Sequence, residues 1–175
     1  MPRPHCAQKV LKMPAKKQDE DMMCTFACGE MIELFYNPNS SRNQISIAQS
    51  IWAPEENYNR GIESILMNGH VGYKLEKIES VIYYDMIADK PTTIVNEINN
   101  GNPFIAGLRI TDPLSHAVVV SGYLNIGGIN YVIYNEPMTK KRNLITYTSF
   151  ANGGIPAGET KAAWWYTYIT KKNEE

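Results

Sequence analysis

The chain is poor in cysteine and histidine, with three of each among 175 residues. The cysteines stand at positions 6, 24 and 28. An odd and small number of cysteines does not make a disulfide framework, and a chain of this length needs none for stability. Cys24 and Cys28 lie four residues apart within an apparent helix, a spacing that fits disulfide geometry poorly. We therefore expect at least one free thiol.

The chain also lacks an excess of charge of either sign and any long hydrophobic run. Its 17 Lys and Arg against 18 Asp and Glu give a net charge of −1. No surplus of cations is available to neutralise a row of phosphates, which argues against a nucleic-acid-binding protein. No apolar run approaches the roughly 18 to 20 residues that span a bilayer. The basic N-terminus lacks the apolar stretch of a signal peptide.

What the sequence does contain is helical periodicity in its first half and strand patterns in its second. Apolar residues at helical spacing predict helices over residues 22–36, 41–52, 59–67 and 91–99. Asp19 or Asp21 is expected to cap the first of them. Segments rich in Val, Ile, Tyr and Trp predict strands over residues 103–110, 116–124, 130–134, 144–147 and 163–169. We expect an irregular segment over residues 1–17 and a single α+β domain over 18–175.

Cys24 falls at the first turn of the first predicted helix. Unpaired backbone N–H groups and the positive end of the helix dipole stabilise a thiolate at that position. Cys28 lies one turn deeper and farther from those groups. The simpler interpretation is that both cysteines are small buried hydrophobic residues. The helix start nevertheless makes Cys24 the candidate nucleophile.

Three other residue types could complete the chemistry of a thiolate. His116 opens the apolar strand HAVVV, so the sheet could fix its imidazole. The next strand ends in YNEP, where a side-chain oxygen could accept the imidazole N–H and set its tautomer. Gln18, six residues before Cys24, carries an amide that can donate to a developing oxyanion. His5 and His70 are predicted to be surface residues. His5 lies in the irregular N-terminal tail, and His70 follows the Asn68-Gly69 pair that ends the third predicted helix.

This ordered set resembles the papain-like cysteine peptidases. The stretch QDEDMMC (residues 18–24) is similar to the family's oxyanion glutamine, followed at the same six-residue interval by the nucleophile. SHAVVVSGY (residues 115–123) is similar to the family's histidine strand, and YNEP (residues 134–137) to the strand end with the third catalytic residue. The separation of Cys24 and His116, 116 − 24 = 92 residues, resembles the compact bacterial members. These include the leader-peptide peptidases of bacteriocin exporters and the plant-pathogen effector peptidases.

The resemblance implies a helical N-terminal half packed on a twisted antiparallel sheet, with a cleft between them. It implies an endopeptidase that cleaves peptide or protein substrates through the Cys24 thiolate, with His116 as acid and base and Gln18 at the oxyanion. No metal or organic cofactor is implied. Because the bacterial members often act outside the cytoplasm, a secreted or extracytoplasmic location is expected. One departure is Thr25, which stands where the family often has Trp.

The third catalytic residue has two candidates. Alignment on Pro137 points to Glu136, where Asp or Asn is usual in the family. Its neighbour Asn135 is the chemically expected residue type. Adjacent residues of a strand face opposite sides of the sheet, so only one of the two can reach His116.

Three other functions remain open from the sequence. The domain could be a catalytically silent papain-like module used for binding. The same residues could instead carry out deamidation or acyl transfer. A zinc site built from Cys24, Cys28 and His116 is disfavoured, because no second cysteine pair completes a set of four ligands.

Overall fold

A computed structural model describes residues 7–21, 23–51, 71–78, 94–111 and 114–174. The helices within these residues are α1 (Cys24–Tyr36), α2 (Gln44–Ile51), α4 (Ile94–Asn99) and α5 (Tyr147–Ala151). The strands are β1 (Ala7–Val10), β2 (Tyr73–Ile78), β3 (Phe104–Thr111), β4 (Leu114–Ile126), β5 (Ile129–Glu136), β6 (Lys141–Thr146), β7 (Ile155–Ala157) and β8 (Thr160–Lys172). The predicted α+β class is confirmed.

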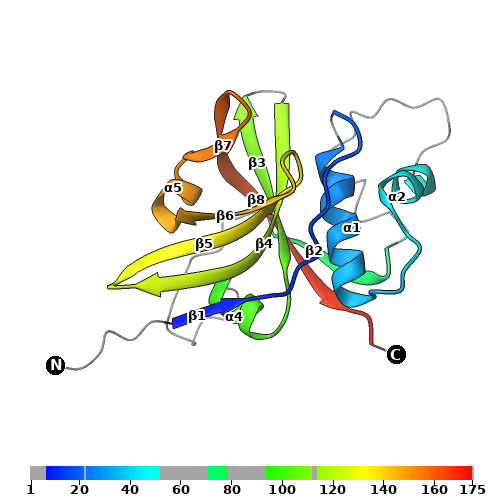
Figure 1. Cartoon of the computed structure of the whole chain (residues 1–175), viewed down its shortest axis with the longest axis horizontal. Helices are drawn as coiled ribbons and strands as arrows, with labels where there is room; N and C mark the ends of the chain where they lie inside the picture. Colours follow the sequence, from blue (N-terminus) through cyan, green and yellow to red (C-terminus); the bar gives the residue numbers. More distant parts are fainter. Residues whose placement is uncertain (1–6, 22, 52–70, 79–93, 112–113, 175) are drawn as a thin grey trace.

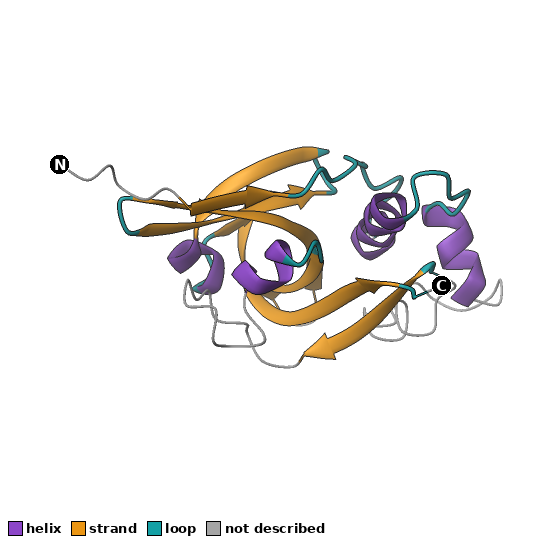
Figure 2. Cartoon of the chain, turned by 90° about the horizontal axis from the view of Figure 1, so that it is seen from below, coloured by secondary structure: helices purple, strands orange, loops and turns teal. Residues whose placement is uncertain are grey.

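The strands form an antiparallel sheet in the order β2-β8-β3-β4-β5-β6, with β1 paired to β4 and β7 paired to β8. Helices α1 and α2 lie on one side of this sheet, whereas α4 and α5 lie on the other (Figure 1). Figure 2 shows the sheet curving around the side that carries α4 and α5. In the described part of the chain, no helix is long and apolar enough to cross a membrane.

Side chains of β4 alternate between two hydrophobic cores, one on each face of the sheet. Val118 and Val120 face the core that contains α4 and α5. Ala117 and Val119 face the core shared with α1 and α2. Both faces of the strand are therefore apolar, and each fully buried valine contributes roughly 1.5–3 kcal/mol of transfer free energy. This double burial fixes β4, and with it the position of its first residues.

Helix α1 begins at Cys24, two residues later than predicted, and ends at Tyr36 as predicted, but it lacks the predicted cap. The N-cap residue is Met23, and no side chain caps the helix. The prediction of Asp19 or Asp21 as the cap is wrong. The backbone N–H of Asp19 instead donates to the side chain of Gln44 on α2, and both aspartates are exposed. The first turn contains no acidic residue, so no carboxylate repels a thiolate there.

The expectation of an irregular segment over residues 1–17 is wrong for residues 7–10, which form β1. This strand pairs with residues 122–125 of β4. It is only four residues long, so its existence depends on a distant partner and not on a local pattern. Gly122 permits the close approach, because a Cβ atom there would lie 2.7 Å from the Lys9 carbonyl oxygen.

Other boundaries differ by local effects. The predicted helix over residues 59–67 lies outside the described residues, and the one over 91–99 is described from Ile94 onward. Tyr147 begins α5 and does not extend β6, because the side chain of Thr146 caps this helix by accepting the Ser149 N–H at 3.3 Å. Helix α2 begins at Gln44, after a reciprocal cap between Asn43 and Ser46, each N–H donating to the other side chain at 2.9 Å.

Candidate active site

The start of α1 and the start of β4 meet at Cys24. This residue is 8% exposed, and its thiol lies within hydrogen-bonding reach of the His116 imidazole and of the Ala117 backbone N–H. The helix supplies the sulfur at its positive end, and the strand supplies the ring. Residues 92 positions apart in sequence are thus brought into contact, because α1 packs on the face of the sheet that Ala117 lines.

The far side of the imidazole is held by Glu136 at the end of β5. His116 Nε2 lies 2.8 Å from one carboxylate oxygen of Glu136 and 3.0 Å from the other. The Met138 backbone N–H also donates to Glu136 Oε1, at 2.9 Å. Both side chains of the His116–Glu136 pair are about 5% exposed. With Nε2 engaged by the carboxylate, Nδ1 is the ring nitrogen left for the Cys24 sulfur.

Asn135 does not contact the ring. It pairs across the sheet with Val119 and points to the opposite face from Glu136. Its side-chain oxygen accepts a hydrogen bond from Ser121 Oγ at 2.7 Å in a buried position. Of the two candidate partners of His116, the structure therefore brings Glu136 to the ring and places Asn135 in a separate contact.

The electrostatics of the site favour a thiolate beside an imidazolium. Burial raises the pKa of Cys24, but the hydrogen bond and charge of His116 and the Ala117 N–H outweigh it, so the net pKa is lowered. Burial lowers the pKa of His116, but Cys24 and Glu136 together raise it to about 9. The two shifts agree, because each ion stabilises the other.

Cys28, one turn along α1, differs sharply from Cys24. It is fully buried, and this burial, together with the charges of Cys24 and Glu136, raises the pKa of its thiol well above the ordinary value. Cys28 is therefore an inert, neutral hydrophobic residue at physiological pH.

Gln18 lies in the segment of residues 11–21 that joins β1 to α1, called here the strap. Its backbone N–H donates to the Pro137 carbonyl at 2.9 Å, next to Glu136. Its side-chain Nε2 donates one hydrogen bond to the Glu20 carbonyl at 3.1 Å. Its Oε1 is buried and has no hydrogen-bond partner in the part of the chain that the structure describes. The amide retains a second Nε2 proton, which is the donor that an oxyanion role requires.

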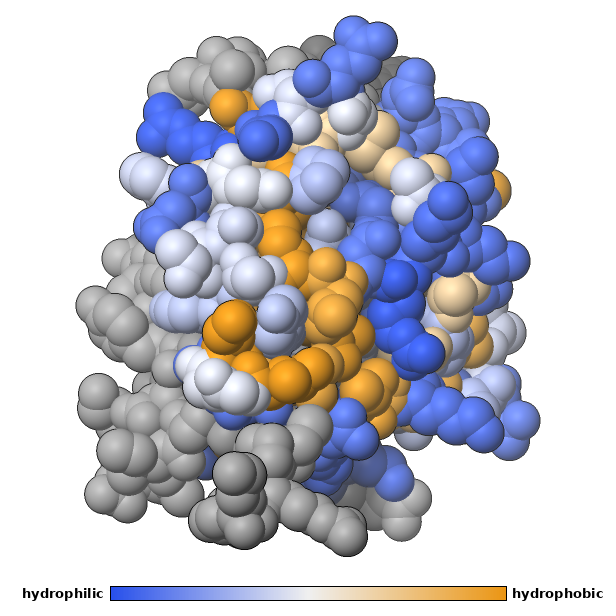
Figure 3. Space-filling view, turned by 60° about the vertical axis from the view of Figure 1, so that its left-hand side comes forward, coloured by the Kyte–Doolittle hydropathy of each residue, from blue (hydrophilic) through white to orange (hydrophobic). Residues whose placement is uncertain are grey.

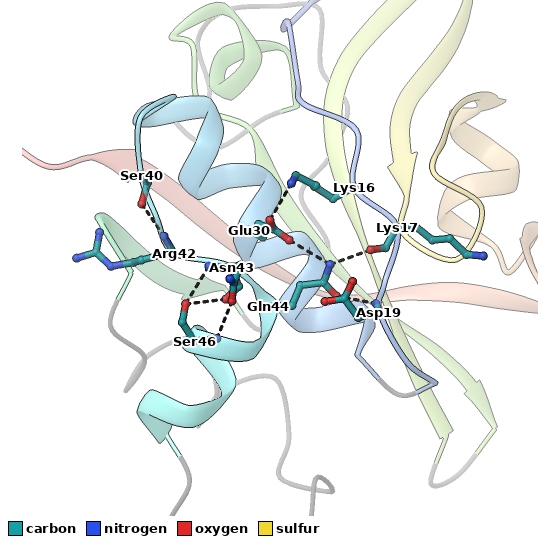
Figure 4. Close-up of polar contacts among 9 residues, drawn as sticks. All are labelled: Lys16, Lys17, Asp19, Glu30, Ser40, Arg42, Asn43, Gln44 and Ser46. Atoms are coloured by element: carbon teal, nitrogen blue, oxygen red, sulfur yellow. Dashed lines mark hydrogen bonds and ion pairs between the residues drawn. The ribbon is translucent and has the colours of Figure 1, made fainter.

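A buried polar network that the sequence did not predict holds the strap (Figure 4). Gln44 Nε2 donates to the Lys17 carbonyl at 2.8 Å and to Glu30 Oε2 at 3.1 Å. Gln44 Oε1 accepts the Asp19 backbone N–H at 3.0 Å. Lys16 forms an ion pair with Glu30 at 2.9 Å. The only sequence signal for this network is a polar residue at the start of an amphipathic helix, which ordinarily lies in solvent.

A cavity of about 510 Å³ opens beside Glu136. Its lining includes Tyr134, Met138, Ile145 and Pro156, with Lys141 as the cation. The turn between β5 and β6 and the segment around β7 enclose it, at the end of the molecule where α1 begins (Figure 1). Figure 3 shows that hydrophobic residues form a band on the face of the molecule turned toward the viewer.

The zinc alternative has no donor set in the described part of the chain. No three His, Cys, Asp or Glu side chains group there as metal ligands. Cys24 and His116 face each other, whereas the side chain of Cys28 is fully buried one turn along α1.

Comparison with known proteins agrees with the geometry. The sequence matches the Peptidase_C39 like family over residues 10–166, a range that includes Gln18, Cys24, His116 and Glu136. No curated protein matches the chain. The family match spans most of the sequence and contains the helical layer and most of the sheet. The chain therefore belongs to the Peptidase_C39 like family, within the papain-like cysteine peptidase superfamily.

Proposed function

We propose that the protein is an endopeptidase that uses Cys24 as its nucleophile. Family membership supports cysteine peptidase activity in general. The observation that carries the assignment to these residues is the His116 ring, which lies between the Cys24 thiol and the Glu136 carboxylate. A buried thiol, imidazole and carboxylate in that order are the parts that thiol-dependent acyl transfer needs.

In this mechanism, the Cys24 thiolate attacks the carbonyl carbon of the scissile peptide bond. The imidazolium of His116 gives its proton to the leaving amine, and an acyl-enzyme thioester remains. His116, now neutral, takes a proton from water, whose oxygen attacks the thioester. The thiolate then leaves and the imidazolium is restored. Glu136 keeps the ring oriented and stabilises its positive charge throughout.

The oxyanion would be bound by the Gln18 amide and the backbone N–H of Cys24. Cys24 is the first residue of α1, so its N–H belongs to the unpaired group at the helix start. Removing one such donor typically lowers turnover by about 10²–10³-fold.

The cavity beside Glu136 supports a peptide as the substrate. His116 protonates the leaving amine, so the residues that follow the scissile bond leave on the histidine side of the site. Of the site residues described above, Glu136 lines the cavity and Cys24, His116 and Gln18 do not, so the cavity adjoins the site from behind the His116 ring. Its Met, Ile, Tyr and Pro lining suits an apolar side chain of the substrate.

The test is cleavage of a denatured protein by the wild-type chain and by Cys24→Ala, with mass analysis of the products. We expect the wild type to produce new N-termini and Cys24→Ala to produce none, whereas Cys28→Ala, the matched control, cleaves normally. Full activity of Cys24→Ala would overturn the proposal. Products that keep their length but gain about 1 Da at glutamine would identify a deamidase. A wild-type chain that binds peptides without cutting them would be a silent binding module.

A further inference from the structure

Gln44 stands out as a buried amide that makes two of its three side-chain hydrogen bonds to the strap. It is 1% exposed and lies at the first residue of α2. Its Nε2 donates to the Lys17 carbonyl, and its Oε1 accepts the Asp19 N–H. The remaining Nε2 proton goes to the buried carboxylate of Glu30 on α1. A fully satisfied buried amide of this kind fixes its partners in one arrangement.

The two strap contacts of Gln44 flank a single residue. The Lys17 carbonyl belongs to the peptide group that precedes Gln18, and the Asp19 N–H belongs to the one that follows it. Gln44 therefore holds both peptide groups of Gln18 from the helical side (Figure 4).

The same residue is held from the side of the sheet. The Gln18 N–H donates to the carbonyl of Pro137, which follows Glu136 at the end of β5. Gln18 is thus bound to the helical layer through Gln44 and to the sheet through Pro137. Among the described residues, its side chain makes one hydrogen bond, to the Glu20 carbonyl, so the backbone contacts determine where the amide lies.

We propose that Gln44 is a positioning residue that sets the place of the Gln18 amide at the oxyanion. This inference rests on the proposed function. Glu30 supports Gln44 in turn, because it is buried and neutralised by Lys16 at 2.9 Å. Loss of the Gln44 contacts frees both peptide groups around Gln18, and a misplacement of about 1 Å in such a site costs roughly 10²-fold.

The test compares Gln44→Ala, Gln18→Ala and the double variant in the full chain. We expect each single variant to lower kcat by roughly 10–100-fold, with a smaller change in KM. The double variant should be no slower than Gln18→Ala alone, because Gln44 acts through Gln18. Alkylation of Cys24 by iodoacetamide at pH 6 should stay at the wild-type rate, since the Cys24–His116 pair is untouched.

The matched control is Ser46→Ala, which removes one half of the reciprocal cap of the same helix, the Ser46 hydroxyl that accepts the Asn43 N–H, without touching the strap. It should leave kcat unchanged. An equal loss of kcat in Ser46→Ala would overturn the inference, because it would assign the effect to the stability of α2. Multiplicative losses in the double variant, or wild-type kcat in Gln44→Ala, would overturn it as well.

A second readout separates this inference from the proposed function. The probe is the aldehyde N-acetyl-Phe-Gly-al. The Cys24 sulfur adds to its carbonyl carbon, and the oxygen of the resulting hemithioacetal occupies the oxyanion position without turnover. Gln44→Ala should bind this aldehyde about tenfold more weakly than the wild type. If the wild type binds the aldehyde but cleaves no peptide, the endopeptidase proposal fails and Gln44 is judged by the aldehyde alone. Equal aldehyde affinity in the two proteins would refute the role of Gln44.

Discussion

The thiolate of Cys24 depends on His116, and His116→Ala measures that dependence directly. In the wild type, the hydrogen bond and charge of His116 overcome the burial that raises the pKa of Cys24. The variant keeps the burial and loses both contributions. Only the Ala117 N–H and the Thr25 side chain continue to favour the charged sulfur. We therefore expect Cys24 to become a neutral thiol near pH 6.

The magnitude follows from the fraction of ionised sulfur. An ordinary thiol of pKa about 8.5 is roughly 0.3% ionised at pH 6, so an intact ion pair raises the thiolate population by up to about 300-fold. A less basic thiolate is a weaker nucleophile, with a Brønsted slope of about 0.4–0.5, which reduces the gain to roughly 10–100-fold. Because burial persists in His116→Ala, its alkylation should be slower still than that of an ordinary thiol, at least about 10-fold below the wild type.

The assay is a time course with iodoacetamide at pH 6, with the modified cysteine assigned by mass spectrometry. Label in the wild type should appear on Cys24 before Cys28, whose pKa is raised by burial and by its charged neighbours. Cys28→Ala serves as the control and should react like the wild type. If His116→Ala is alkylated within twofold of the wild-type rate at pH 6, the ion pair does not exist and the reasoning fails.

Three further predictions concern the neighbours of this pair. Glu136→Ala should lower kcat by about 10²-fold, within the range for acid–base catalysis. Asn135→Ala should keep the wild-type kcat but lower the free energy of unfolding in urea by about 1–3 kcal/mol, because it leaves the buried Ser121 hydroxyl unpaired. Met138→Glu should raise KM about tenfold for peptides with an apolar residue after the scissile bond. The control Ile129→Glu also replaces an exposed hydrophobic residue, but at the far end of β5, and should leave KM unchanged. Peptide cleavage should fall as the pH rises through about 9, where the imidazolium loses its proton, whereas alkylation of the thiolate should not fall; a cleavage rate that is flat to pH 10 would contradict this.

Short local motifs allowed the sequence to place candidate residues on a helix and a strand. A cysteine at a helix start and a histidine at a strand start keep their positions because α1 and β4 are strongly apolar over many residues. To choose between Glu136 and Asn135, one must know which side chains of β5 lie on the same face of the sheet as His116. That facing depends on the pairing of two strands and on the register shift between Val120 and Gly122, which no local pattern reveals.

The parts that the sequence did not predict depend on distant partners. Strand β1 exists because β4 offers it an edge, and four residues carry too little periodicity to show this. Gln44 occupies a position that reads as the polar start of an exposed helix, yet the strap covers it. The aspartates before α1 look like caps, but α1 begins only at Cys24, so that Met23 occupies the N-cap position instead.

The strap has a consequence for how the protein would respond to mild urea. Residues 11–21 form neither helix nor strand; hydrogen bonds to α2, Ser121 and Pro137, the Lys16–Glu30 ion pair and the buried side chains of Leu11 and Met13 hold them in place. A segment without a ladder of helix or sheet hydrogen bonds opens at a lower free energy than the core strands. Catalytic turnover should therefore disappear at urea concentrations where the circular dichroism of the helices and sheet is still native.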